Sequence, residues 1–257
     1  MKQTCIGQAG DTVSSAIEIK HLTKRHAHRA VVNDVSFRAQ AGRVTAFLGP
    51  NGAGKSSTLR ILLGLDRADA GTATIYGKAY RDLECPMRVV GFTMDGPAAS
   101  KGRSARNHLK WVAMAAGVPA RRVDEVLALT GLEAVAGKRV GEFSLGMGQR
   151  LGLATALLGD PSVLVLDEPM NGLDPEGIRW MRGFLRQSAS SGKAVLMSSH
   201  FMDEVEAVAD DVVVIADGRV MAQGTLDEVR GSHHNLEDAF FAITESAGTD
   251  AHGEVGE

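Results

Sequence analysis

The sequence is poor in cysteine, in charge of one sign and in long hydrophobic stretches. Its 257 residues include only Cys5 and Cys85, too few for a disulfide framework or a four-cysteine zinc site, which favours a reducing compartment. Lys and Arg number 28 against 31 Asp and Glu, and a formal charge of −3 argues against a protein that coats nucleic acid. We therefore expect no nucleic-acid partner. No apolar run approaches the roughly 18–20 residues that cross a bilayer, so we also expect no membrane span.

What the sequence does have is an alternation of β-branched runs and helical stretches, typical of a parallel sheet covered by helices. Four runs are continuously apolar, like buried parallel strands, over residues 44–48, 163–166, 194–197 and 212–216. Three others resemble exposed or edge strands and are candidates for a separate antiparallel layer, over 17–19, 31–37 and 72–76. The predicted class is therefore α/β.

The chain is expected to hold one main domain. From about residue 95 to 160 the pattern is helical, with predicted helices over 105–116, 121–130 and 144–159, which indicates a helical subdomain inserted in the α/β core. The first 15 residues lack the apolar stretch of a signal peptide and are predicted to be a flexible tail. A single domain over 16–230 is then followed by a C-terminal helix, near 236–244, and a flexible tail that ends at 257.

A glycine-rich motif follows the first of the buried strands. Residues 49–56 match G-x-x-x-x-G-K-[ST] between a predicted strand and a predicted helix, which is the context that a phosphate-binding loop requires. Glycines let successive N–H groups curl around phosphate oxygens, while Lys55 reaches the β- and γ-phosphates and Ser56 offers its hydroxyl to Mg²⁺. The alternative is an accidental glycine turn with a solvated lysine. The predicted nucleotide-binding residues are Gly49, Pro50, Asn51, Gly52, Ala53, Gly54, Lys55, Ser56 and Ser57.

Two adjacent carboxylates, Asp167 and Glu168, end another buried strand. Carboxylates are costly at such a place unless they meet a cation or water. Strand alternation directs neighbouring side chains to opposite sides, so Asp167 is predicted to hold the metal while Glu168, just past the strand, polarises the attacking water. The alternative is that both lie in a loop or cap the next helix.

Taken with this loop and these carboxylates, three further segments resemble the ATP-binding cassette (ABC) ATPases. They occur in the family's order: a signature-like segment at 143–150, about 17 residues before Asp167, a D-loop-like Asn-Gly-Leu-Asp at 171–174, and a switch-like histidine, His200, after two serines. The signature is specific, since other phosphate-loop ATPases and kinases lack it. The resemblance covers about residues 17–224 and implies a phosphate-loop NTPase fold with a RecA-like parallel core, an antiparallel β layer and a helical subdomain.

In this family two cassettes pair head to tail, so that the signature of one caps ATP on the other. The resemblance therefore implies that Ser144 and Gly146 touch the γ-phosphate of a second chain, that His200 contacts the γ-phosphate of its own, and that Asp174 contacts the dimer partner. The residues also allow structural roles: Ser144 can cap the helix that follows it, and Asp174 before Pro175 is a strong helix start.

The sequence departs from the family at three places. Leu145 and Met147 replace the first Gly and the Gln of the signature, which predicts fewer contacts to the partner's ATP. Asp95 stands where the family has a glutamine that meets Mg²⁺, and it can accept a hydrogen bond but not donate one. His26 stands near where a family aromatic stacks on adenine, although an ordinary surface histidine is the alternative.

The resemblance implies an ATPase that binds ATP and Mg²⁺, dimerises, and drives a separate transmembrane permease from the cytoplasmic side of the cell membrane as a peripheral subunit. The pattern at 224–229 and 236–241 resembles bacterial multidrug or antibiotic exporters, whereas the cargo and the choice between homodimer and heterodimer stay open. Two alternatives remain: a non-transport ATPase acting on DNA or ribosomes, and a degenerate cassette used for regulation. The charge of −3 disfavours the first, and the complete catalytic set disfavours the second.

Overall fold

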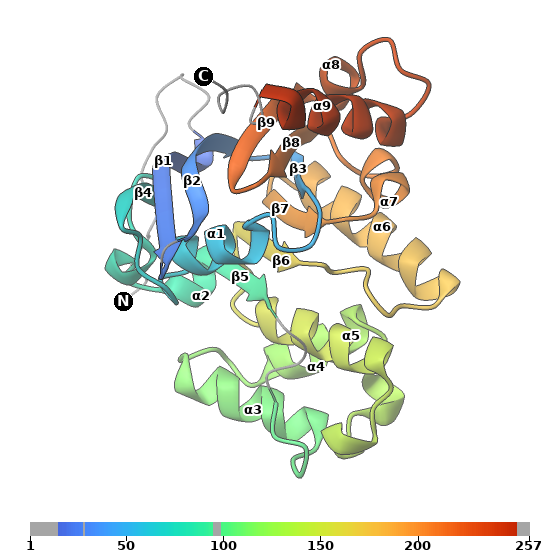
Figure 1. Ribbon diagram of the computed structural model, residues 1–257. Coiled ribbons are helices and arrows are strands. Elements are labelled where there is room, and N and C mark those ends of the chain that lie inside the picture. The colour runs from blue at the N-terminus through green and yellow to red at the C-terminus, as the bar shows by residue number, and fades with distance from the viewer. Residues whose placement is uncertain (1–14, 28, 95–98, 251–257) are drawn as a thin grey trace.

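The computed structural model describes residues 15–27, 29–94 and 99–250, with side chains described as far as residue 245 (Figure 1). The strands are β1 (Ser15–His26), β2 (Arg29–Gln40), β3 (Val44–Leu48), β4 (Ala70–Ile75), β5 (Val90–Thr93), β6 (Val163–Asp167), β7 (Ala194–Ser199), β8 (Asp211–Ala216) and β9 (Arg219–Thr225). The helices are α1 (Lys55–Leu62), α2 (Pro86–Val89), α3 (Ala105–Ala115), α4 (Arg121–Leu129), α5 (Leu145–Ala156), α6 (Pro175–Ser190), α7 (Met202–Glu206), α8 (Leu226–Arg230) and α9 (Leu236–Asp250).

The first sheet is a three-stranded antiparallel layer in the order β2-β1-β4. The separate antiparallel layer predicted from the sequence is thus confirmed. The prediction of exposed or edge strands is wrong for β1, which is the central strand and buries Ile17, Ile19 and Leu22. The reason is that this sheet packs one face on the rest of the core, so that its apolar residues cannot be exposed.

The second sheet has the order β5-β6-β7-β3-β8-β9. Its first five strands run parallel, and β9 pairs with β8 in the antiparallel direction. The four continuously apolar runs form the adjacent strands β6, β7, β3 and β8, as their burial on both faces requires. The predicted α/β class is confirmed, although β5 and β9 were not predicted.

Alternating residues of this parallel sheet enter two hydrophobic cores. In β3, Phe47 faces α1 and the antiparallel layer, whereas Val44, Ala46 and Leu48 face the side that α5, α6 and α9 cover. The parallel strands end at one common edge, because Leu48 pairs with Ser199, and Asp167 pairs with Ser198. Ligands of open α/β sheets bind at this edge, where Asp167, Glu168 and His200 end or follow their strands.

Helices α3, α4 and α5 form a lobe beneath the sheets in Figure 1, after β5 and before β6. They lie where the sequence predicts helices. The predicted C-terminal helix is present as α9 and runs to Asp250, beyond the predicted end at 244. The expected tails fall outside the described residues at 1–14 and 251–257.

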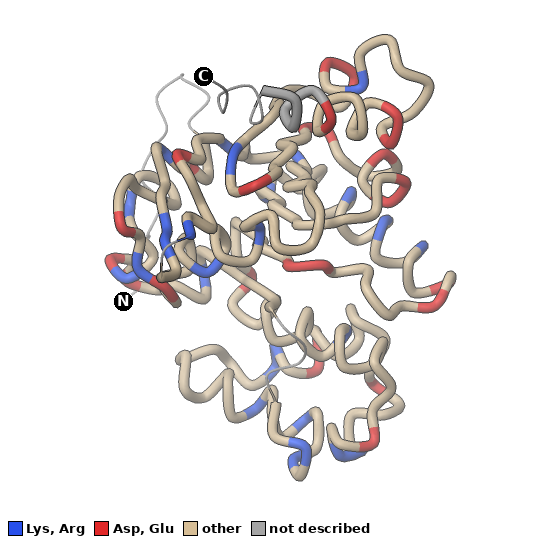
Figure 2. Tube along the Cα trace, in the orientation of Figure 1, with Lys and Arg blue, Asp and Glu red and all other residues tan. Residues whose placement is uncertain are grey.

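Charges of both signs are interspersed over the body of the two sheets (Figure 2). Within the described residues, no helix is both long enough and apolar enough to cross a membrane.

Candidate active site

The glycine-rich loop connects β3 to α1, and its geometry depends on glycine at position 54. Gly54 has a φ of 103° and caps α1 without help from a side chain among the described residues. A Cβ atom there would lie 2.3 Å from the carbonyl oxygen of Val31. The first N–H groups of α1 therefore have neither intrahelical acceptors nor a side-chain cap, and they lie in the wall of a pocket that can take an anion.

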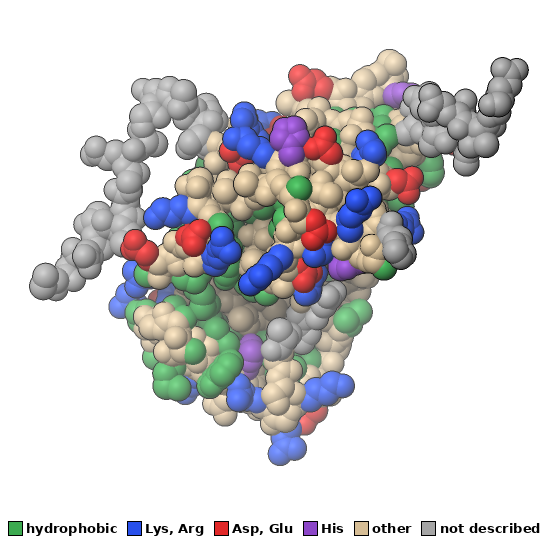
Figure 3. All heavy atoms as spheres, turned by 60° about the vertical axis from the view of Figure 1, so that its left-hand side comes forward, with side chains coloured by type: hydrophobic (Ala, Val, Ile, Leu, Met, Phe, Trp, Pro, Cys, Tyr) green, Lys and Arg blue, Asp and Glu red, His purple; other side chains and the backbone are tan. Residues whose placement is uncertain are grey.

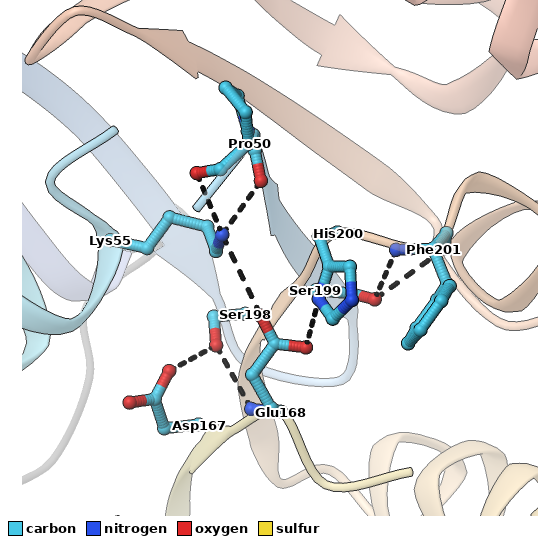
Figure 4. A network of polar contacts seen from close by, with 9 residues as sticks. Pro50, Lys55, Asp167, Glu168, Ser198, Ser199, His200 and Phe201 are labelled. Carbon is cyan, nitrogen blue, oxygen red and sulfur yellow. Dashed lines mark hydrogen bonds and ion pairs between the residues drawn. The ribbon is translucent and has the colours of Figure 1, made fainter. Parts of the chain in front are cut away.

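Lys55 lies at the start of α1 with its amine enclosed, since only 5% of its surface is exposed. Its Nζ donates hydrogen bonds to the carbonyl oxygens of Gly49 at 2.6 Å and Pro50 at 3.2 Å. The same nitrogen lies 3.6 Å from Oε1 of Glu168 (Figure 4). A buried positive charge is thus held beside a carboxylate at the edge where the parallel strands end.

Asp167 and Glu168 are tied together by Ser198 at the end of β7. The Ser198 hydroxyl donates to Oδ1 of Asp167 and accepts from the backbone N–H of Glu168 at 3.0 Å. Strand alternation predicts that the two carboxylates face opposite ways, but both line one pocket. The reason is a left-handed backbone at Glu168, with a φ of 48°, which ends the alternation and turns this side chain toward Lys55.

His200 completes this network. Its Nδ1 lies 2.8 Å from Oε2 of Glu168, so that Glu168 bridges Lys55 and His200 (Figure 4). The ring of Phe201 lies 3.8 Å from the imidazole, centre to centre. This histidine is therefore oriented by one carboxylate and one aromatic ring.

A pocket of about 490 Å³ brings Lys55, Asp167 and Glu168 together, and His200, which does not line it, contacts Glu168. Its walls come from the glycine-rich loop and α1, from the end of β6, and from the start of α5 in the helical lobe. The lining residues are Val31, Asn51, Gly52, Gly54, Lys55, Ser56, Ser57, Thr93, Met94, Leu145, Gln149, Asp167, Glu168 and Asn171. Sequence reasoning assigned no role to Val31, Thr93, Met94 or Gln149; the position of Thr93 and Met94 directly before Asp95 was the available signal.

The donor set of the pocket fits a magnesium nucleotide. Hard cations prefer oxygen ligands, and the Ser56 hydroxyl and the Asp167 carboxylate both line the pocket beside the phosphate-binding loop. Within the described residues there is no group of three or more His, Cys, Asp or Glu that could enclose a metal. A cation here would therefore take some of its ligands from the protein and others from phosphate oxygens, as Mg²⁺ does at nucleotide sites.

The remaining predicted residues lie at different places. Ser144 caps α5, its hydroxyl accepting from the N–H of Met147 at 3.2 Å, and Gly146 follows in the first turn. Asp174 caps α6 in the same way, accepting from Gly177 N–H at 2.7 Å. His26 is exposed at the end of β1 and is not part of the pocket wall. Asp95 lies outside the described residues.

One further carboxyl lies near the network and was not predicted. Burial raises the pKa of Glu204 on α7 above its usual value, with Arg182 opposing the rise and Glu168 adding to it. Glu204 therefore shares the electrostatic surroundings of Glu168 and His200.

The fold and the pocket together define a phosphate-loop ATPase of the α/β class. The family model described as "ABC transporter" matches residues 32–171. The chain is 37% identical to the lantibiotic transport ATP-binding protein SrtF of Streptococcus pyogenes, with 87% of this chain and 95% of SrtF aligned. It is 36% identical to the bacitracin transport ATP-binding protein BcrA of Bacillus licheniformis, covering 85% of this chain and 72% of BcrA.

A solved structure described as the ATP binding subunit of an ABC transporter matches with a TM-score of 0.81 and 29% identity, covering 90% of this chain and all of the other. The chain therefore belongs to the ABC transporter family, as an ATP-binding subunit that hydrolyses ATP, and the resemblance predicted from its sequence is confirmed. Subunits of this kind dimerise and work with transmembrane partners, and the non-transport alternative is not favoured.

Proposed function

We propose that this chain binds MgATP, pairs head to tail with a second cassette, and drives a separate permease that exports a drug or antibiotic. It would act as a peripheral subunit on the cytoplasmic face of the membrane. The printed roles of two relatives, lantibiotic transport and bacitracin transport, support this class of cargo. The observation that carries the proposal is that Lys55 and Glu168 line one pocket beside the phosphate-binding loop, with His200 bonded to Glu168.

In the binding step, residues 49–57 surround the triphosphate. The N–H groups of the loop and of the first turn of α1 donate to phosphate oxygens, and Lys55 adds its charge at the β- and γ-phosphates. Ser56 and Asp167 would hold Mg²⁺, which supplies positive charge at the same phosphates. We assign His26 a stacking contact with adenine and Asp95 a place beside the metal, both as proposals that rest on family resemblance.

In the hydrolytic step, Glu168 orients the attacking water and accepts its proton. The Nδ1 atom of His200 holds one carboxylate oxygen of Glu168, which leaves the other oxygen near Lys55. His200 then contacts the γ-phosphate from its place just beyond β7. Because a positioned base contributes roughly 10²–10⁴-fold to such reactions, removal of the Glu168 carboxylate should abolish most turnover.

The second cassette completes each site. Ser144 and Gly146 lie at the N-terminal end of α5, which is the positive end of that helix and suits a γ-phosphate from another chain. Asp174, at the start of α6, is proposed to contact the partner cassette.

The helical lobe is the proposed contact with the permease. Figure 3 shows hydrophobic side chains gathered on the lower part of the molecule, and on α3 the exposed fractions are 53% for Trp111 and 76% for Met114. Exposed apolar patches on soluble domains commonly mark interaction sites, which supports a protein partner at this lobe.

The proposal is tested by steady-state ATP hydrolysis of the purified chain with its permease, compared with Glu168→Gln. We expect turnover in the wild type and its near-complete loss in the variant, with ATP still bound. Wild-type protein as inert as the variant would refute the catalytic assignment. For the cargo class, co-expression with the permease in a susceptible bacterium should raise resistance to a peptide antibiotic, and Glu168→Gln should not.

A further inference from the structure

Leu145 and Gly172, from two separate segments, fit together because the leucine side chain lies where glycine has none. Leu145 is the first residue of α5, and Gly172 lies in the turn between β6 and α6. A Cβ atom on Gly172 would lie 2.1 Å from Cδ2 and 2.7 Å from Cγ of Leu145. The leucine side chain therefore occupies space that only a glycine leaves open.

The turn that contains Gly172 is also connected to Glu168, the proposed base. The N–H of Asn171 donates to the carbonyl oxygen of Glu168 at 3.1 Å, and the N–H of Leu173 donates to the carbonyl oxygen of Met170 at 3.2 Å. Asn171 and Leu145 both line the nucleotide pocket. A short series of contacts thus runs from Glu168 through the turn to the first residue of α5.

The neighbouring residues extend the same contact. A Cβ atom on Gly146 would lie 3.5 Å from Cδ2 of Leu173, which is ordinary van der Waals distance. Leu145 itself is 63% exposed, so core packing does not hold it in place. An exposed leucine at the start of α5 therefore packs against the turn.

We infer that Leu145 is a positioning residue that ties the signature segment to the Glu168 turn within one chain. This inference rests on the proposed function, in which the signature of one cassette closes over the nucleotide of another. Movement of α5 during closure is then passed to the base of the same chain. A glycine at position 145 has no side chain with which to make this contact.

The test is a cycle of four proteins: wild type, Leu145→Ala, Gly172→Ala and the double variant. In Gly172→Ala the new methyl displaces the leucine side chain. In the double variant the nearest remaining atom is Cβ of residue 145, at 3.6 Å, which is an ordinary contact. The matched control is Gly117→Ala in the helical lobe, because Gly117 also has a positive φ, of 64°, but no atom within 4 Å of its Cβ position.

We expect Gly172→Ala alone to lower kcat by about 10- to 100-fold, since a misplacement of about 1 Å can cost 10²-fold in rate. After Leu145→Ala, the Gly172→Ala change should lower kcat no further than the Gly117→Ala control does. The Kd for ATP should change far less than kcat in every variant, because the phosphate-binding loop is intact. The same pattern should appear in ATP-driven dimerisation when all four proteins also carry Glu168→Gln.

If the double variant loses kcat by the product of the two single losses, with normal ATP binding, the inference is overturned. The proposed function then still stands. Failure of the wild type itself to bind ATP would instead overturn the proposed function. All measurements are made well below the melting temperature of every variant. Unfolding caused by backbone strain at position 172 is then not counted as lost activity.

Discussion

The nucleotide pocket has two halves that differ in how they are built. The phosphate half is formed by the loop before α1 and the ends of β6 and β7, and its polar groups are bonded to one another inside the chain. The signature half is the start of α5, where Ser144 bonds only to its own helix among the described residues and Leu145 is 63% exposed.

This difference indicates that the two halves serve different molecules. A buried charge must be paired within its own chain, so Lys55 is held by two carbonyl oxygens and Glu168, and Glu168 by His200, before ATP arrives. The N-terminal end of α5 is capped and accessible, as expected for a surface that meets phosphate on another cassette. Substitutions in the phosphate half should therefore affect ATP binding, and substitutions in the signature half should affect dimerisation and turnover.

The largest effect is expected for Lys55→Ala in the phosphate half. Truncation of one partner of a buried, hydrogen-bonded charge pair costs about 2–5 kcal/mol, which corresponds to an affinity for MgATP at least about 30-fold weaker. Calorimetric titration measures this directly. Lys193→Ala is the control, because Lys193 pairs with Asp160 at the surface, away from the pocket. Equal affinity in both variants would show that the pocket is not the nucleotide site.

Ser144→Ala addresses the signature half with a smaller effect. Loss of an N-cap costs about 1 kcal/mol, or about 2–4 °C in Tm for a chain of this size. Ser104→Ala is a matched control, since Ser104 caps α3 in the same lobe by accepting from Asn107 N–H. Both variants should lose similar Tm and keep the wild-type Kd for ATP, but only Ser144→Ala should weaken ATP-driven dimerisation. If Ser104→Ala weakens it equally, Ser144 is a helix cap and nothing more.

The smallest effect is expected for Glu204→Gln beside the phosphate half. Burial raises the folded pKa of Glu204, so ionising it disfavours the fold as pH rises from the unfolded value of 4.5 through the folded pKa. Arg182, His200, Glu168 and Asp203 also act on this carboxyl. The variant should therefore be more stable at pH 7, by about 1 kcal/mol or less for a partly exposed group, and equal to wild type below that window.

Thermal unfolding at pH 4 and pH 7 measures this difference. Glu84→Gln, at an exposed carboxylate that is not among the groups acting on Glu204, serves as the control. A gain in Tm at pH 4 as large as the gain at pH 7 would contradict the assignment to Glu204 ionisation.

The strand, loop and helix of the phosphate half could be predicted from the sequence because their signals are local. The run 44–48 is apolar except for Thr45 and coincides with β3, and the motif that follows requires a strand before it and a helix after it. The caps Ser144 and Asp174 are likewise encoded by one residue at the start of each helix. Such features need no knowledge of the rest of the chain.

The contacts between distant segments could not be predicted in this way. β5 has only four residues and includes Gly91, where a Cβ would lie 2.2 Å from the carbonyl oxygen of Ala156, so its glycine is set by packing. The orientation of Glu168 depends on a positive φ that no strand pattern signals. The fit of Leu145 against Gly172 appears only when α5 is placed beside the turn after β6.

The central claim is that each nucleotide is bound by the phosphate half of one chain and closed by the signature half of another. Analytical ultracentrifugation of Glu168→Gln with MgATP tests it most directly, because the variant retains ATP while hydrolysis is blocked. We predict a species of twice the 27.1 kDa mass of one chain, with one nucleotide per chain, which is weakened on adding Ser144→Ala and lost on adding Lys55→Ala. A monomer that holds ATP at saturation would contradict the claim.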